Sequence, residues 1–263
     1  MNSKNLALAG QVAVVTGSTQ GIGAGISRNF AEQGARIVVH GLERHKLQAE
    51  GLVAEIESSG GEALIVLGDL KQEAHCRDVI RQTLERFGRL DILVNNAGIY
   101  TRGDVEETSV ALWDEILAVN LRAPFILCQE AIKHMKQRLS GCIINIGSLA
   151  VYVGLRRLCA YSASKGGLMT LTRNLANHLT KYRIRVNQIN PGWVLSEGEH
   201  HLRSVKEGLG ENWLEEALKT RPFGRMLSPA DIAHAALFFA TNELITGAVL
   251  DYEQSVAGAL LEV

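Results

Sequence analysis

The stretch VAVVTGSTQGIGAGISRNFAEQ, residues 12–33, decides the fold of this chain. It begins with an apolar run at 12–16, passes through a glycine-rich turn, and continues at 22–33 with apolar residues at helical spacing. A strand that leads directly into a helix is typical of a βαβ unit. Backbone N–H groups at the start of such a helix can approach a pyrophosphate, because the helix dipole favours negative charge there.

The glycine spacing in this turn is G-x-x-x-G-x-G, at Gly17, Gly21 and Gly23. It differs from the generic dinucleotide spacing G-x-G-x-x-G, and no Gly-Lys-Ser/Thr follows that would make it a Walker loop. Glycine-rich turns are common in proteins of every kind. The turn by itself therefore leaves two interpretations open, a nucleotide-binding loop and a plain turn.

The rest of the chain repeats the alternation of strand and helix. Further apolar runs lie at 36–40, 63–68, 91–95, 142–146, 184–189 and 248–251, and segments with helical spacing lie between them at 43–58, 72–87, 110–138, 160–182 and 229–241. Most of the apolar runs are continuous, which is typical of parallel strands buried on both faces. We predict one α/β fold with a Rossmann-type, doubly wound parallel sheet of about seven strands. The polar segment 192–223 interrupts the pattern, and we interpret it as a substrate lid.

The composition argues against several classes of binding partner and ligand. The chain of 263 residues carries 27 basic and 28 acidic side chains, so it offers no broad positive field for nucleic acid. No apolar run is long enough for a membrane span, and the short apolar stretch at 6–9 is too brief for a secretion signal, so we expect a cytoplasmic protein. The four cysteines show no C-x-x-C spacing, which argues against disulfides and a zinc site, and we expect no metal.

The glycine turn and several later motifs resemble the short-chain dehydrogenase/reductase family from about residue 10 to 255. The resemblance implies that 1–263 form a single dinucleotide-binding and catalytic domain, in which hydride passes between a nicotinamide cofactor and a secondary alcohol or carbonyl. It implies a catalytic set at Asn120, Ser148, Tyr161 and Lys165. It implies cofactor contacts at Gly17, Ser18, Thr19, Gln20, Gly21, Ile22, Gly23, Gly41, Leu42, Asp69, Leu70, Asn96, Ala97, Gly98, Tyr161, Lys165, Pro191, Gly192 and Val194.

Tyr161 and Lys165 are four residues apart, so they share one face of the predicted helix. One interpretation is structural: the phenol packs at the rim and the lysine extends past it to solvent. The other is catalytic, because a nearby cation lowers a phenol pKa of about 10 toward the neutral range. Ser148 either positions a substrate oxygen or only caps a turn. The resemblance implies a water relay at Asn120.

The choice between NAD and NADP rests on the end of the second strand. Gly41 stands where the family's NAD-selective aspartate would stand, and Leu42 at the usual position of the NADP-selective arginine. Gln20 occupies a position that is often basic in NADP-dependent relatives. The missing arginines favour NAD, while Arg44 or His40 leaves NADP open.

The substrate is less determined. By resemblance its pocket involves Ser148 and the side chains Tyr100, Val153, Arg156, Trp193 and Glu197. Segment 192–199 and the ending 246–255 look similar to sugar and polyol dehydrogenases of the family, although the ending reads L-D-Y-E-Q where V-D-G-G is usual. The expected substrate is therefore a small sugar or polyol.

Two other functions stay open. A 3-oxoacyl thioester reductase is the alternative within enzymes, and a catalytically silent, nucleotide-binding redox sensor is the alternative outside them. The resemblance also implies a homotetramer, or a homodimer, formed through the helices at 110–138 and 160–182, with the apolar tail 256–263 packed on a neighbouring subunit.

Overall fold

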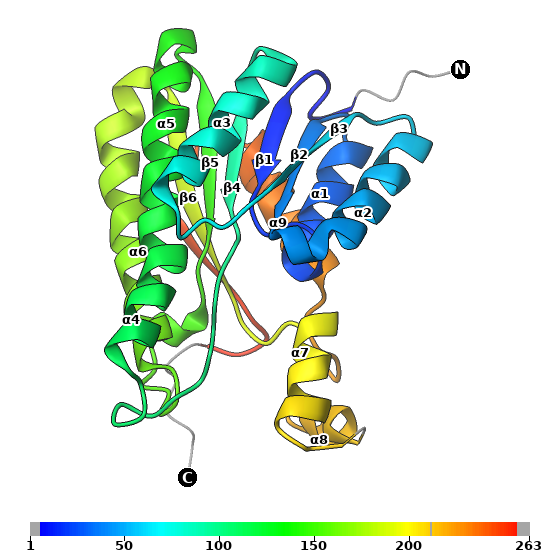
Figure 1. Cartoon of the computed structure of the whole chain (residues 1–263), viewed down its shortest axis with the longest axis vertical. Coiled ribbons are helices and arrows are strands. Elements are labelled where there is room, and N and C mark those ends of the chain that lie inside the picture. Colours follow the sequence, from blue (N-terminus) through cyan, green and yellow to red (C-terminus); the bar gives the residue numbers. More distant parts are fainter. Residues whose placement is uncertain (1–5, 211, 257–263) are drawn as a thin grey trace.

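The computed structural model of the protein describes residues 6–210 and 212–256. One sheet of parallel strands runs through its centre in the order β3-β2-β1-β4-β5-β6-β7 (Figure 1). The strands are β1 Val12–Val15, β2 Arg36–Gly41, β3 Ala63–Leu67, β4 Ile92–Asn95, β5 Gly141–Ile146, β6 Ile184–Pro191 and β7 Val249–Tyr252. The strand order reverses between β1 and β4, which confirms the predicted doubly wound Rossmann-type sheet.

Helices cover both faces of this sheet. They are α1 Gly21–Glu32, α2 Lys46–Ser58, α3 Glu73–Phe87, α4 Val110–Leu117, α5 Ala123–Arg138, α6 Cys159–Leu179, α7 Glu197–His201, α8 Trp213–Lys219 and α9 Pro229–Thr241. Neighbouring residues of a strand point to opposite faces. Ala13 and Val15 pack with α1, α2 and α9, whereas Val12 and Val14 pack with α3, α5 and α6. Burial on both faces explains why the apolar runs in the sequence are continuous.

The segment predicted as one helix at 110–138 is interrupted. Between α4 and α5 the chain makes a π-helical turn, Ala118–Arg122. Pro124 stands in the first turn of α5 and has no N–H group to donate to the carbonyl of Asn120, so regular α-helical bonding cannot continue there. Asn120, a predicted catalytic residue, lies inside this turn.

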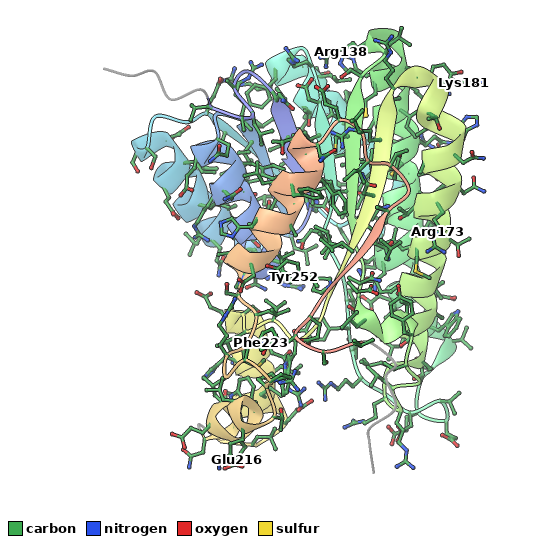
Figure 2. All side chains as sticks on the ribbon, turned by 180° about the vertical axis from the view of Figure 1, so that it is seen from behind. Arg138, Arg173, Lys181, Glu216, Phe223 and Tyr252 are labelled. Atoms are coloured by element: carbon green, nitrogen blue, oxygen red, sulfur yellow. The ribbon has the colours of Figure 1, made fainter. Side chains whose placement is uncertain are left out.

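The lid segment stands apart from the layers. Figure 1 shows α7 and α8 beyond the end of the sheet at which β1 and β6 finish. Here Trp213, Ala217 and Met226 form a small apolar cluster of their own, against which Trp193 packs. In Figure 2, Phe223 lies at the end of this segment nearest the sheet and Glu216 at its far end.

Several remaining predictions can be compared with this fold. All four cysteines are free thiols, and three of them are buried. None of the helices in 6–210 and 212–256 is long and apolar enough to cross a bilayer. The tail expected to pack on a neighbouring subunit lies outside the described residues from 257 onward.

Candidate active site

A cavity of about 550 Å³ opens at the carboxyl ends of the parallel strands, where ligands bind in doubly wound folds. Most of the predicted cofactor residues line it: Gly17, Thr19, Gln20, Gly21, Ile22, Gly41, Leu42, Asp69, Leu70, Asn96, Ala97, Gly98, Tyr161, Lys165, Pro191, Gly192 and Val194. Ser18 and Gly23 lie behind the wall and shape it. The fold therefore brings together motifs that are spread over most of the chain.

The glycine loop is shaped by close backbone approaches. Gly17 has φ +62°, and a Cβ built on it would lie 2.8 Å from the Cα of Ala97. A Cβ on Gly23 would lie 2.5 Å from the carbonyl oxygen of Gly17 and equally close to the Asn96 amide. Larger residues at these two positions would push the loop away from the segment after β4 and change its shape. A cradle of backbone without side chains beside a helix start fits the phosphates of a dinucleotide.

Hydrogen bonds from the neighbouring strands fix this loop. The Thr16 hydroxyl accepts from the backbone N–H groups of Asn96 and Ala97, each at 3.0 Å. The side-chain amide of Asn96 donates to the carbonyls of Thr16 and Gly17, at 2.9 and 3.0 Å. Asn96 therefore connects the end of β4 to the loop after β1.

His40, at the end of β2, stabilises the same loop from the other side. Its Nδ1 accepts from the backbone N–H of Gly17 at 3.2 Å, and its backbone N–H donates to the Ser18 hydroxyl at 3.0 Å. Burial, together with the neighbouring His75, lowers the pKa of His40 to about 3. The imidazole is therefore neutral and already hydrogen-bonded, which does not suit it to the phosphate contact that the sequence left open.

Other residues at the β2 and β3 end of the cavity carry charge. Arg44 and His45 line the wall, and no carboxylate from 40–45 does so. Asp69 accepts from the backbone N–H of Lys71 at 2.9 Å, and the Lys71 ammonium lies 2.8 Å from Glu115. Sequence reasoning missed Lys71 and Glu115, because they come from different segments and match no motif.

The predicted catalytic pair lies on the first turns of α6. The Lys165 ammonium is buried, donates to the carbonyl of Ile146 at 2.7 Å and stands 5.7 Å from the centre of the Tyr161 ring. Burial lowers the pKa of Lys165 to about 8. Burial also raises the pKa of Tyr161, and the hydrogen bond with the Ser148 hydroxyl offsets part of this increase. The pKa of Tyr161 is therefore raised, whereas the catalytic interpretation of the sequence predicted a decrease caused by Lys165. The reason is that the Lys165 ammonium is directed at a backbone carbonyl and that Tyr161 and Lys165 are both shielded from water.

Ser148 combines both interpretations given to it. It follows β5 and lines the cavity beside Tyr161. Its hydroxyl also accepts from the backbone N–H of Ala150 at 3.2 Å, as the cap of a short 3₁₀ turn. The cap fixes the position of the oxygen that faces the cavity.

Asn120 does not line the cavity. Its side-chain oxygen accepts from the backbone N–H of Ile99 at 2.8 Å, and its amide donates to the Ile99 carbonyl at 2.8 Å and to Ser164 at 3.1 Å. The side chain therefore clamps the segment after β4. Its role in a water relay stays a prediction, and such a relay would have to use the Asn120 backbone carbonyl that Pro124 leaves without an α-helical partner.

Of the predicted substrate residues, Ser148, Tyr100 and Trp193 line the cavity, whereas Val153, Arg156 and Glu197 do not. Arg156 and Glu197 are exposed. Glu199 lines the cavity in place of Glu197. Residues i and i+2 of an α-helix are separated by about 200° around its axis, so these two acids point to opposite sides of α7. Both acids are visible in the sequence, but the residue at which this short helix begins was not predicted. That starting residue decides which of the two acids faces the cavity.

The unusual ending of the chain fastens the lid. The Glu253 carboxylate accepts from the backbone N–H of Trp193 at 3.1 Å, and a Cβ on Gly192 would collide with it. The Gln254 side chain accepts from the N–H of Phe223 at 2.9 Å and donates to the carbonyl of Arg225 at 2.5 Å. Glu253, at the position of a usual glycine, and the following Gln254 thus hold the two ends of the lid.

Known proteins are similar to this chain in sequence and in fold. Residues 11–207 match the family described as short chain dehydrogenase. A 3-oxoacyl-[acyl-carrier-protein] reductase from Chlamydia pneumoniae is 33% identical over 90% of this chain and 92% of its own. L-fucose dehydrogenase from Mus musculus is 37% identical over 89% of this chain and 83% of its own. A solved structure of a putative NAD(P)-dependent gluconate 5-dehydrogenase from Beutenbergia cavernae, with bound NADP at low occupancy, has 34% identity and a TM-score of 0.83, covering 94% of this chain and 96% of that one.

The chain therefore belongs to the short-chain dehydrogenase family. It is an oxidoreductase of the short-chain alcohol dehydrogenase and carbonyl reductase type, which acts on CH–OH groups.

Proposed function

We propose that this short-chain dehydrogenase interconverts a secondary alcohol and a carbonyl group of a small hydroxylated molecule, a sugar or a polyol. One observation carries the proposal: Tyr161, Ser148 and Lys165 converge on the cavity that also holds the glycine loop. A catalytic set that faces a nucleotide cradle is what hydride exchange between a cofactor and a bound alcohol requires. The same observation argues against a silent redox sensor, which would not need these three groups in one wall.

The roles follow from the chemistry of each group. A nicotinamide cofactor, when bound, accepts or supplies the hydride. Tyr161 takes the substrate's hydroxyl proton in oxidation and returns it in reduction, while the Ser148 hydroxyl positions the substrate oxygen. Because burial raises the pKa of Tyr161, the phenol is protonated near neutral pH, which suits reduction. Oxidation should accelerate as the pH rises. Lys165 would contact the ribose next to the nicotinamide.

The glycine loop would hold the cofactor phosphates, and Arg44 would decide between NAD and NADP. No carboxylate from 40–45 lines the cavity to bind the ribose hydroxyls, and Arg44 lines it where a 2′-phosphate would lie. We therefore expect the kcat/KM values for NAD and NADP to lie within about tenfold of each other. Arg44→Ala should lower kcat/KM for NADP and leave that for NAD nearly unchanged. A preference of a hundredfold or more for either cofactor in the unchanged protein would contradict this.

A 3-oxoacyl thioester reductase is the second candidate, supported by the relative from Chlamydia pneumoniae. The mouse L-fucose dehydrogenase supports the sugar or polyol. Acetoacetyl thioesters and aldoses separate the two candidates in one assay. Turnover of the thioester without turnover of any sugar or polyol would replace the proposed substrate.

We also propose assembly into a homotetramer, or a homodimer, through α4, α5 and α6. A shallow apolar groove crosses these helices, lined in part by Leu117, Leu121, Phe125 and Leu171, and the Phe125 ring is half exposed. Covering such a groove with a second copy would remove apolar surface from water. A monomer in sedimentation at micromolar concentration would contradict the assembly.

The substitution Tyr161→Phe tests the reaction. The ring keeps its packing but loses the proton-exchanging oxygen, so turnover should fall by about a thousandfold or more while cofactor affinity changes less than about threefold. Reduction of NAD and of NADP is followed by absorbance over a panel of aldoses, polyols and 3-hydroxy acids. Substantial activity in the variant would contradict the role of Tyr161.

A further inference from the structure

We propose that Glu199 selects the substrate: its carboxylate accepts a hydrogen bond from a hydroxyl of a neutral sugar or polyol and excludes substrates that carry a carboxylate or phosphate. The inference rests on the proposed function and adds the charge class and the selecting residue.

Glu199 reaches the cavity because of how α7 begins. The Ser196 hydroxyl accepts from the backbone N–H of Glu199 at 3.2 Å and caps the helix. Helix α7 then passes over the cavity between the glycine loop and Tyr100: a Cβ on Gly198 would lie 3.9 Å from the Gln20 amide and 4.0 Å from the Tyr100 hydroxyl. The next residue, Glu199, lines the cavity wall.

One oxygen of the Glu199 carboxylate is fully used for orientation. Oε1 accepts from the indole N–H of Trp193 at 2.8 Å and from Nε of Arg203 at 2.8 Å. The Arg203 guanidinium also stands 4.7 Å from the centre of the Trp193 ring. No hydrogen bond to Oε2 comes from the part of the chain that the structure describes. The carboxylate is thus held rigid by one oxygen while the other stays available to a ligand.

Glu199 faces the same space as the proton-exchanging tyrosine. Tyr100 packs edge-on against Tyr161, with ring centres 6.5 Å apart. Glu199 and Tyr100 line the same cavity, and a Cβ on Gly198, next to Glu199, would lie 4.0 Å from the Tyr100 hydroxyl. Tyr161 and Glu199 therefore bound the substrate space with Tyr100 between them. A substrate whose reacting carbon lies at Tyr161 presents its next hydroxyl groups toward Glu199.

The charges around this space reject anions. The cations Arg44 and Lys71 follow β2 and β3, whereas Ser148 and Trp193 follow β5 and β6, so these cations line the opposite, cofactor end of the cavity. At the substrate end the Lys165 ammonium is bonded to a backbone carbonyl.

The guanidinium groups near Glu199 and Trp193 are already paired. The Arg203 charge is met by Glu199 at 2.8 Å and by Glu207 at 3.0 Å, Arg102 pairs with Glu207 at 2.7 Å, and Arg221 lies 3.7 Å from Glu253. A substrate carboxylate would lose its water beside Glu199 and would have to compete with these carboxylates for a counter-charge, which is unfavourable. A hydroxyl donor would satisfy the available oxygen.

The test compares Glu199→Gln with Glu197→Gln, which makes the same change two residues away on the exposed side of α7. Each variant is assayed with neutral polyols and with hydroxy acids of the same carbon length. Glu199→Gln should lower kcat/KM for polyols by about tenfold or more, mainly through KM, because the amide donates where the carboxylate accepts. It should raise kcat/KM for the hydroxy acids and leave cofactor affinity unchanged. Glu197→Gln should behave like the unchanged protein.

Binding is measured in parallel by calorimetry, with the cofactor-saturated protein titrated with a polyol and with a hydroxy acid. A preference of the unchanged protein for the acid, or equal behaviour of the two glutamine variants, would overturn the inference. Failure of the proposed function looks different: the unchanged protein would turn over none of the alcohols. In that case, polyol binding that weakens in Glu199→Gln but not in Glu197→Gln would still support the selecting role of Glu199. Polyol binding that does not weaken in Glu199→Gln would contradict this role.

Discussion

The glycine loop and the lid line the same cavity, yet they are held in opposite ways. Hydrogen bonds between side chains and backbone, made by Thr16, Asn96 and His40, hold the loop against the ends of the central strands. The lid rests on a small cluster around Trp213, on ion pairs such as Arg203 with Glu199, and on two hydrogen-bonded stems. Hydrogen bonds anchored in a large core open rarely, whereas ion pairs around a small cluster contribute little and open easily. We therefore propose that the rigid part serves the part of the cofactor common to all reactions and that the looser part serves the substrate.

The largest effect on binding should come from a steric clash inside the glycine loop. In Gly23→Val the new Cβ would meet the Gly17 carbonyl at 2.5 Å, so the backbone of the cradle must shift. Overpacking of this kind costs about 1–3 kcal/mol or more, so we expect cofactor affinity to fall by about a hundredfold. Fluorescence titration with the reduced cofactor measures this.

The matched control is Gly51→Ala in α2, where no atom lies within 4 Å of the added Cβ. It should leave cofactor affinity unchanged and stabilise the fold by about 0.5–1 kcal/mol, because alanine favours the helix. Tight cofactor binding by Gly23→Val would show that the loop is not rigid.

The second effect uses pH to weaken the loop without a steric clash. His40 titrates at 6.5 in an unfolded chain and at about 3 in the fold. Its contribution to stability is therefore complete above about pH 6.5 and is lost by about 1.4 kcal/mol for each pH unit below it, because the unfolded chain then binds the extra proton. His40→Asn keeps an acceptor for the Gly17 N–H and removes the titration.

Urea unfolding at pH 7, 6 and 5 measures this difference. The free energy of unfolding of the unchanged protein should fall more steeply with acid than that of His40→Asn. If the free energies of unfolding of the two proteins fell equally with decreasing pH, His40 would not be neutral in the fold.

A smaller effect is expected when a lid stem is released. Glu253→Ala removes the acceptor for the Trp193 N–H and a charge 3.7 Å from Arg221. The substrate KM should rise about tenfold and protease cleavage within 193–225 should accelerate, while cofactor affinity changes less than about threefold.

Glu243→Ala, on the exposed turn after α9, is the control and should change none of these quantities. Mass spectrometry of the early fragments locates the cleavage. A large loss of cofactor affinity in Glu253→Ala would mean that loop and lid form one cooperative unit.

The smallest effect should follow loss of a single ion pair of the lid. Arg102, after β4, pairs with Glu207 at 2.7 Å, and both side chains are partly exposed. Such a pair contributes about 0.2–1 kcal/mol, so Arg102→Gln should raise the substrate KM by no more than about fivefold. Salt at 1 M should bring the unchanged protein close to the variant. A KM change above tenfold, or no response to salt, would show that the pair is shielded from solvent and central to the lid.

Much of the fold was predictable because neighbouring residues encode it. The continuous apolar run at 12–16 and the glycines at 17, 21 and 23 correspond to β1 and a loop whose backbone approaches exclude a side chain. The last strand differs from its predicted range by one residue, 249–252 against 248–251. Helices α1, α3 and α9 match their predicted ranges to within one residue. The α-helices predicted at 43–58 and 160–182 are shorter, because 43–45 and 180–182 form 3₁₀ turns, and Pro124 altered the bonding around Asn120.

The chemistry of the site was less predictable, because it depends on contacts between distant segments. Glu197 and Glu199 are equivalent in composition, and only the position of the α7 cap decides which of them reaches the cavity. The pKa of Tyr161 is raised instead of lowered, because packing removes water from the phenol and Lys165 bonds to the Ile146 carbonyl.

The sequence by itself determined the strand and helix order and the glycine loop, and it supplied the predicted catalytic set. Steric limits and burial patterns act between residues that are close along the chain, so they can be read from it. Only the tertiary structure decided that His40 supports the loop, that Lys71 and Glu115 line the cavity and that Glu253 fastens the lid. These outcomes depend on desolvation and on distances between residues far apart in the chain, which exist only after the chain has packed.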